Sequence, residues 1–225
     1  MNYPNSLITN YFGKNSDIRG ILFDLDGVLV DMCDAHKWSL NKALLYYENF
    51  EISDEQHKLN YDGLPTKTKL QKLLKLGLIS GDNLDKIFDL KQSFTLTYID
   101  TITPDPIRIQ MLQKLQNDNI VCGCVTNSIR STAVKMLKNS GLYDYLSFII
   151  TNEDSPNPKP YPDPYLMGIN RLKMKVGEVI AVEDNINGIK SAESAGLKVF
   201  VVQDYETLNY ENIRIVGFLF GCIGL

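Results

Sequence analysis

Two carboxylates separated by a single residue are the sharpest chemical signal in the sequence. Asp24 and Asp26 follow the apolar residues 21–23 and precede Gly27. Residues two apart on an extended strand point the same way, so both carboxylates can contact one ligand. One can act as a nucleophile and metal ligand while the other transfers a proton. Gly27 permits the turn that must follow, although polar strand ends and calcium loops have similar patterns.

Further polar clusters follow apolar runs later in the chain. Thr126, Asn127 and Ser128 come after one run, and Glu183 and Asp184 after another. Both clusters can bind ions, and both can equally be helix N-caps. Lys159 lies between Pro158 and Pro160, which stiffen its loop. The alternative interpretation is that Lys159 is an ordinary lysine of a loop, exposed to solvent.

Short apolar runs alternate with segments of helical periodicity. Continuous apolar runs indicate strands that are buried on both faces of a parallel sheet; they span residues 21–23, 120–125, 148–150, 179–182 and 199–202. We expect helices between them at 106–117, 131–140, 163–172 and 187–195. The alternation predicts an α/β fold with a doubly wound, Rossmann-like parallel sheet. Ligands bind beyond the carboxyl ends of such strands, where all the polar clusters stand.

Residues 32–103 have a different pattern, with helical segments and no strand. We expect helices over 34–50, 66–76 and 82–99, and a short one opened by a capping box at Ser53–Gln56. The predicted division is an N-terminal extension (1–19), an α/β catalytic core (20–31 and 104–225) and an inserted helical cap (32–103). The apolar stretch 213–225 is predicted to be a late strand or helix of the core.

The composition narrows the classes of partner. With 23 Lys and Arg against 27 Asp and Glu, the net charge is −4. No basic surface for nucleic acid or an anionic membrane is therefore expected. Cys122 and Cys124 lie in an apolar run without a matching Cys or His pair, which favours buried thiols over a zinc site. We see no signal peptide or membrane span and expect a cytoplasmic protein; the sequence leaves the oligomeric state open.

Taken together, the motifs resemble those of the haloacid dehalogenase superfamily, in the branch of phosphotransferases with an inserted helical cap. The resemblance covers residues 21–203, most of the chain. Four motifs occur in the family's order, at Phe23–Leu29, Val125–Ser128, Lys159–Asp163 and Val182–Asn185. Met32 and Asn157 depart from the usual pattern near the first hinge and before the third-motif lysine.

The resemblance implies a role for each motif residue. Asp24 would be the nucleophile that forms an aspartyl phosphate, and Asp26 the general acid and base. Thr126, Asn127, Ser128 and Gly27 would bind the phosphoryl group, and Lys159 would offset its charge. Mg²⁺ would be held by Asp24, Asp26 through its carbonyl, Glu183 and Asp184. In the cap, His36 would couple closure of the cap to the general acid; the alternative is that it is a partly buried residue of its helix. Lys67 or Thr66 would contact the leaving group; the alternative is that Thr66 caps a helix.

The predicted function is a Mg²⁺-dependent phosphatase that hydrolyses a small phosphorylated metabolite. The nearest alternative is a phosphomutase of the β-phosphoglucomutase type, which uses the same core. A non-catalytic binding protein on the same fold is the alternative from another class. The full set of motif residues counts against it. A nucleotide-dependent oxidoreductase is disfavoured because no G-x-G-x-x-G run follows the first strand.

Overall fold

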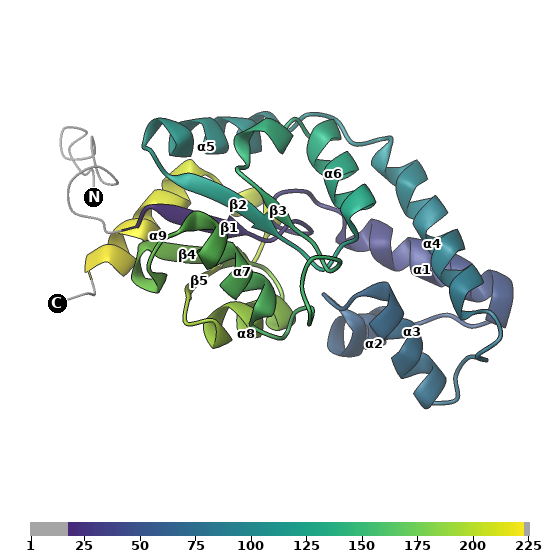
Figure 1. Cartoon of the computed structure of the whole chain (residues 1–225). Helices are drawn as coiled ribbons and strands as arrows, with labels where there is room; N and C mark the ends of the chain where they lie inside the picture. Colours follow the sequence, from purple (N-terminus) through teal and green to yellow (C-terminus); the bar gives the residue numbers. More distant parts are fainter. Residues whose placement is uncertain (1–17, 223–225) are drawn as a thin grey trace.

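The described part of the chain is a parallel sheet between two helical layers, with a separate group of helices at one end (Figure 1). The computed structural model describes residues 18–222, with side chains described through residue 216. The strands lie in the order β3-β2-β1-β4-β5. They are β1 (Gly20–Phe23), β2 (Val121–Val125), β3 (Ile149–Ile150), β4 (Val179–Glu183) and β5 (Lys198–Val201). The predicted α/β, Rossmann-like parallel sheet is thereby confirmed.

The helices begin and end close to their sequence signals. Asp105, for example, accepts the N–H groups of Ile107 and Arg108 and so caps the helix that begins at Pro106. The α-helices are α1 (Cys33–Glu48), α2 (Asp54–Gln56), α3 (Thr66–Lys75), α4 (Leu84–Ile99), α5 (Pro106–Asn117), α6 (Arg130–Asn139), α7 (Asp163–Leu172), α8 (Ile186–Ser194) and α9 (Tyr210–Cys222). A π-helical turn, η2 (His57–Tyr61), follows α2, and short 3-10 turns are η3 (Tyr143–Tyr145), η4 (Val176–Glu178) and η5 (Tyr205–Thr207).

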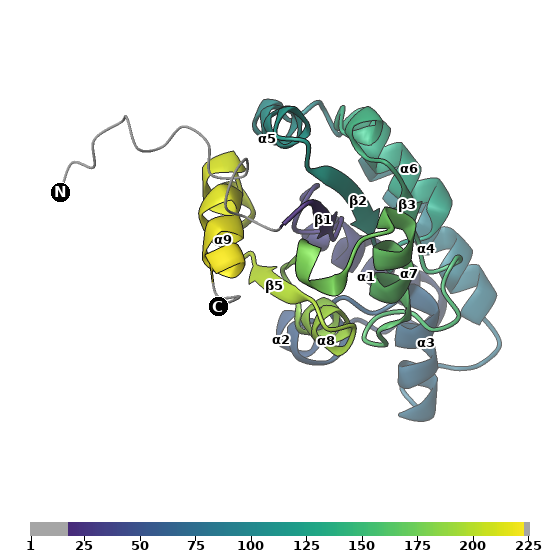
Figure 2. The same ribbon diagram turned by 60° about the vertical axis from the view of Figure 1, so that its left-hand side comes forward.

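Each face of the sheet buries its own apolar cluster. Ile21 and Phe23 of β1 pack with residues of α5 and α6, whereas Leu22 packs with Tyr165 and Ile169 of α7. This alternation follows from the opposite directions of successive strand side chains. Figure 2 shows α5 and α6 on one side of the sheet, α7 and α8 on the other, and α9 beside β5.

The expectation that every strand is buried on both faces is wrong for β5. This strand is at the edge of the sheet, and its Lys198 and Val201 are exposed. An edge strand has only one neighbour, so its side chains receive less cover. The stretch predicted as a late strand or helix is helical in α9, with residues 223–225 outside the described part. Residues 1–17 of the predicted extension also lie outside it, while Ile18 is buried in the core.

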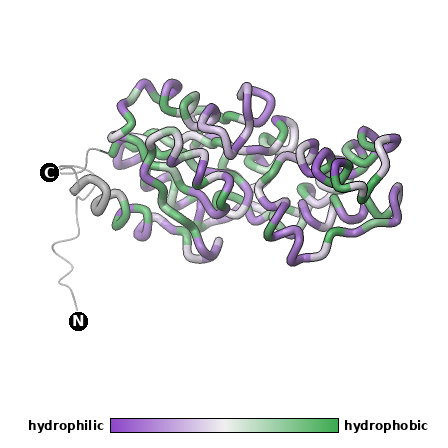
Figure 3. The backbone as a smooth tube through the Cα atoms, turned by 90° about the horizontal axis from the view of Figure 1, so that it is seen from below, coloured by the Kyte–Doolittle hydropathy of each residue, from purple (hydrophilic) through white to green (hydrophobic). Residues whose placement is uncertain are grey.

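Helices α1 to α4, with η2, form a group with its own apolar interior, which we call the helical unit. Leu40 and Leu44 of α1 pack with Leu70 and Leu73 of α3 and with Ile87 of α4. Figure 3 shows hydrophobic segments inside both this unit and the sheet part of the chain. The division of the chain into a catalytic core and a cap stays a prediction. No helix of the described residues is both long and apolar enough to cross a membrane.

Arg108 connects segments that are distant in the sequence. It is 1% exposed, and its guanidinium donates to the carbonyl oxygens of Val28 at 3.2 Å, Leu208 at 2.7 Å and Tyr205. The guanidinium also lies over the ring of Tyr205. A buried cation is tolerated here because three carbonyl acceptors satisfy it. Arg108 thus fixes the turn after β1 against the C-terminal part of the chain.

Candidate active site

The register of the central strands brings the polar motifs together. Phe23 of β1 pairs with Cys124 of β2 and with Val182 of β4. The residues that follow these three positions therefore emerge at the same edge of the sheet. Asp24, Thr126 and Asp184 all line one cavity of about 490 Å³ there, the size of a small-molecule site. The cavity opens between the sheet and the helical unit.

The segment after β1 is a tight turn that aims its two carboxylates. The carbonyl of Leu25 accepts the N–H groups of Leu29 and Val30, both at 2.9 Å. Gly27 has a φ of +84°, a conformation that favours glycine. A Cβ at this position would lie 2.1 Å from Oδ2 of Asp184. Gly27 therefore both permits the turn and leaves room for an acidic side chain.

Lys159 is the central cation of the site. Its Nζ donates to Oδ1 of Asp24 and Oε1 of Glu183, each at 2.6 Å, and to the carbonyl of Val125 at 2.7 Å. The side chain is 2% exposed, which excludes the interpretation as a solvated loop lysine. The neighbouring Tyr165 donates its hydroxyl to Oε1 of Glu183 at 2.5 Å.

Three carboxylates gather beside this lysine. Asp24, Glu183 and Asp184 offer oxygens that all lie within 4.8 Å of one another. Burial and the charge of Asp24 raise the pKa of Asp184 to about 7 and that of Glu183 to about 8. Burial likewise raises the pKa of Asp24, against the opposing charge of Lys159. One ammonium cannot neutralise three carboxylates, so the cluster fits a hard divalent cation with oxygen ligands.

Asp26 lines the same cavity and contacts the helical unit. Its Oδ2 accepts from Oγ of Ser128 at 2.9 Å, and its Oδ1 lies 2.8 Å from Nε2 of His36. The Nδ1 of His36 in turn lies 3.2 Å from Nζ of Lys91. Although burial raises the pKa of Asp26, His36, Ser128 and Lys91 outweigh it and hold the pKa below its usual value.

The second motif also contacts the helical unit. The side-chain amide of Asn127 donates to the carbonyls of Gly63 at 2.8 Å and Lys159 at 3.1 Å. Nearby, the side-chain amide of Asn187 donates to the carbonyl of Asp62 at 2.7 Å. The turn at residues 62–63 is thus held against the sheet from two sides. Thr126 is buried and accepts the N–H of Ser128 through its hydroxyl at 3.0 Å.

The N-cap alternatives are wrong for both polar clusters. Helix α6 has Ile129 at its N-cap, beyond the Thr126–Ser128 cluster. Helix α8 is capped by Asn185, which follows Glu183 and Asp184 and also donates its side-chain amide to Oδ1 of Asp184 at 2.9 Å. In the helical unit, α3 has Pro65 at its N-cap, so capping by Thr66 is also wrong.

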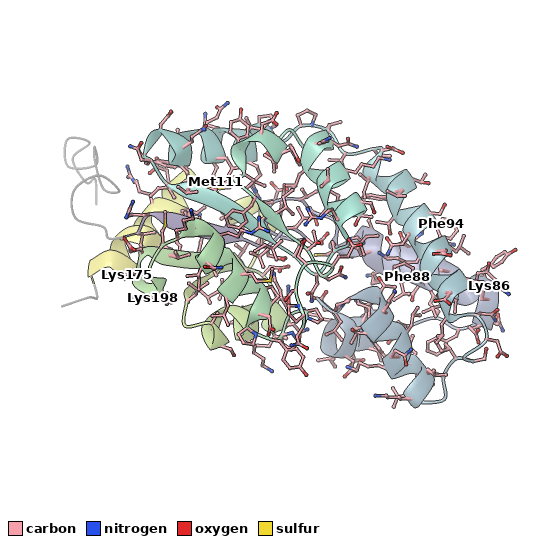
Figure 4. All side chains as sticks on the ribbon, viewed as in Figure 1. Lys86, Phe88, Phe94, Met111, Lys175 and Lys198 are labelled. Atoms are coloured by element: carbon pink, nitrogen blue, oxygen red, sulfur yellow. The ribbon has the colours of Figure 1, made fainter. Side chains whose placement is uncertain are left out.

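Lys67 differs in exposure from two other lysines of the cavity, which the sequence did not indicate as site residues. Lys67 is exposed, and its Nζ lies 5.3 Å from the centroid of the Phe88 ring on α4, which is labelled in Figure 4. Lys69 and Lys91 also line the cavity but are only 7% and 5% exposed. The chain has many lysines, and no local pattern distinguishes these two from solvent-exposed ones.

Comparison with known proteins agrees with this site. A pyrophosphatase PpaX from Oceanobacillus iheyensis is 30% identical over 186 residues, which cover 82% of this chain and 83% of that protein. A phosphoglycolate phosphatase from Nitrosospira multiformis is 28% identical over 191 residues, with the same coverage. These names agree with the predicted class of phosphoric monoester hydrolase.

Solved structures and a family model extend the comparison. A β-phosphoglucomutase from Clostridium difficile shares the fold with a TM-score of 0.79 at 23% identity, covering 92% of this chain and 99% of that one. The family model described as haloacid dehalogenase-like hydrolase matches residues 21–202. Since this match spans most of the chain and all four motifs, the protein belongs to the haloacid dehalogenase-like hydrolase family.

Proposed function

We propose that this protein is a Mg²⁺-dependent phosphatase that hydrolyses a small phosphorylated metabolite through an aspartyl phosphate on Asp24. The observation that carries the proposal is the contact of Lys159 with Asp24 at 2.6 Å beside the acids Glu183 and Asp184. An ammonium at this place neutralises a nucleophilic carboxylate and an incoming phosphoryl group together. The free thiols of Cys122 and Cys124 suit the reducing cytoplasm, which we propose as the location.

The metal would be held by the carboxylates of Asp24, Glu183 and Asp184 and the carbonyl of Asp26. Glu183 has Oε1 engaged by Lys159 and Tyr165, whereas Oε2 accepts only a long hydrogen bond of 3.5 Å from Asn185 and is the freer of the two. When bound, a divalent cation supplies positive charge to the phosphoryl oxygens. The excess of acids over cations in this buried cluster supports such an occupant.

In the first half-reaction, a carboxylate oxygen of Asp24 forms a bond to phosphorus as the bond to the leaving oxygen breaks. Asp26 gives its proton to that leaving oxygen. An ionised Asp26 must first gain a proton, and the approach of a phosphoryl dianion raises its pKa in the required direction. In the second half-reaction, the oxygen of a water molecule forms a bond to phosphorus as the bond from phosphorus to Asp24 breaks, and Asp26 takes a proton from that water. Inorganic phosphate leaves, and both carboxyl groups return to their starting states.

The test is a screen of phosphorylated metabolites with Mg²⁺, in which released phosphate is measured. We expect the wild type to release phosphate and Asp24→Asn to have no detectable turnover, with circular dichroism unchanged. Asp34→Asn is the matched control, because the Asp34 side chain is 97% exposed at the start of α1. An acid-stable label on protein incubated with ³²P-substrate should require Asp24. Turnover retained by Asp24→Asn would refute the assigned nucleophile.

A phosphomutase is the second candidate, supported by the contact of His36 with Asp26 at 2.8 Å. A cap residue beside the general acid suits an enzyme that must protect its phosphorylated intermediate from water. Such an enzyme would convert a hexose 1-phosphate to the 6-phosphate when primed with a bisphosphate, without net release of phosphate. Steady release of phosphate from several esters would instead support the hydrolase.

A further inference from the structure

The cavity has two walls of opposite charge. On the sheet side four acids, Asp24, Asp26, Glu153 and Asp184, stand against one cation, Lys159. On the side of the helical unit, the described lining residues include one acid, Asp62, against three lysines, Lys67, Lys69 and Lys91. His36 and His57 also line this side, and burial lowers the pKa of both imidazoles. The phosphoryl group belongs at the acidic wall with the metal and Lys159. The opposite wall, therefore, faces the leaving group.

Lys69 is the most informative residue of this second wall. Its side chain is 7% exposed, and no hydrogen bond or ion pair to its ammonium occurs among residues 18–216. Burial lowers the pKa of Lys69 to about 8, so the ammonium persists at neutral pH. The charges of Asp62 and Asp26 oppose this lowering, but neither carboxylate forms an ion pair with Lys69 among the described residues. A buried ammonium without a direct partner is unfavourable unless an anion contacts it.

Two further basic side chains line the cavity beside Lys69: Lys91, whose Nζ lies 3.2 Å from Nδ1 of His36, and His57. Lys91 is 5% exposed, and the positive charge of Lys69, after burial, lowers its pKa to about 8. Two like charges are therefore close enough to oppose each other inside one cavity. His57 is 6% exposed, and its Nε2 has no hydrogen-bond partner among the described residues. We call Lys69, Lys91 and His57 the cationic wall.

We propose that the cationic wall binds a second anionic group, a carboxylate or a phosphate, on the leaving group of the substrate. This inference rests on the proposed function, since it takes the first phosphate to lie at Asp24. The second anion would pair with Lys69, relieve the repulsion between Lys69 and Lys91, and accept or share a hydrogen bond with His57. A cavity of about 490 Å³ limits the whole substrate to a small metabolite.

Binding to the inactive Asp24→Asn protein tests the inference separately from turnover. Isothermal titration with Mg²⁺ would compare 2-phosphoglycolate with 2-hydroxyethyl phosphate, which differ by a carboxylate. It would also compare propane-1,3-diol bisphosphate with 3-hydroxypropyl phosphate, which differ by a phosphate. We expect the second anion to tighten binding in at least one pair by about tenfold to one-hundredfold, as for a charged hydrogen bond. The pair that responds identifies the anion.

When Lys69→Met is added to the Asp24→Asn protein, the preference for ligands with a second anion should disappear. The substitution removes a buried charge and keeps an apolar stem, so the fold should persist, with an unchanged or raised melting temperature. Lys86→Met is the matched control, because Lys86 is exposed at the far end of the helical unit, as Figure 4 shows. It should keep the full preference.

The outcomes separate the two proposals. Equal binding within both pairs, or a preference that survives in Lys69→Met, would overturn the cationic wall even if wild type hydrolyses all four compounds. A preference that depends on Lys69, without turnover of any phosphate ester by the wild type, would retain the anion site and reject the phosphatase.

Discussion

The Nε2 atom of His36 lies 2.8 Å from Oδ1 of Asp26, so the helical unit contacts the carboxylate that we propose as the proton donor. Lys91 holds the other ring nitrogen, with its Nζ 3.2 Å from Nδ1. A protonated Lys91 can only donate, so Nδ1 must accept and the ring proton must lie on Nε2, directed at Asp26. The position of this proton is therefore set by a residue 55 positions away in the chain.

Replacing Lys91 should change the titration of His36. Burial and then the charge of Lys91 hold the pKa of His36 below its ordinary value, so Lys91→Met is expected to raise it. NMR titration of the imidazole signals measures this directly, because the chain has only two histidines. His57 should titrate separately, at a pKa of about 4. Lys86→Met should leave His36 unchanged; an unshifted His36 in Lys91→Met would contradict the contact.

From the sequence we could predict the part of this site that lies directly after the strands. The apolar runs before Asp24, Thr126 and Glu183 pair in register, so three short motifs determine where their polar residues meet. The roles of Lys69 and Lys91 depend instead on how α3 and α4 pack over the sheet. The spacing of residues within a helix does not indicate how that helix packs over the sheet, and a lysine in a helix is usually at the surface.

A substitution at Gly27 should affect the acid cluster. In Gly27→Ala the new Cβ would lie 2.1 Å from Oδ2 of Asp184 and would displace that carboxylate. We expect Mg²⁺ affinity to fall about 10- to 100-fold, as when the supporting groups of a metal site are lost. Calorimetric titration with Mg²⁺ measures the change.

Gly77→Ala is the control for backbone strain. Gly77 has a φ of +67°, close to the left-handed value of Gly27, but apart from its chain neighbours no described residue has an atom within 4 Å of its added Cβ. It should lower the free energy of unfolding by about 1–2 kcal/mol and leave Mg²⁺ affinity unchanged. Equal Mg²⁺ affinities in the two variants would show that Gly27 acts through its conformation alone.

The metal-free protein should lose stability as the pH rises. The pKa of Asp184 is raised to about 7 in the fold, above its usual value, so between about pH 4 and 7 the folded state binds more protons than the unfolded state. This contribution is complete below pH 4 and disappears through pH 7. In EDTA, the melting temperature should therefore fall as the pH rises from about 4 to about 7. Added Mg²⁺ should raise the melting temperature most near pH 7.

Asp184→Asn is the variant that checks this assignment. It removes the titrating carboxyl, so the loss of stability with rising pH in EDTA should become smaller. The gain in melting temperature from Mg²⁺ near pH 7 should shrink as well. The same pH dependence in wild type and variant would assign the effect to other groups.

Arg108 has a consequence for the newly made chain. Its three carbonyl acceptors belong to Val28, Tyr205 and Leu208, so the turn that carries Asp26 is completed only when residue 208 is available. During synthesis on the ribosome, Asp24 and Asp26 are therefore made well before residues 205–208, which supply two of these acceptors. A shortened chain that ends before η5 would hence contain every motif residue and still leave the guanidinium of Arg108 without two of its acceptors.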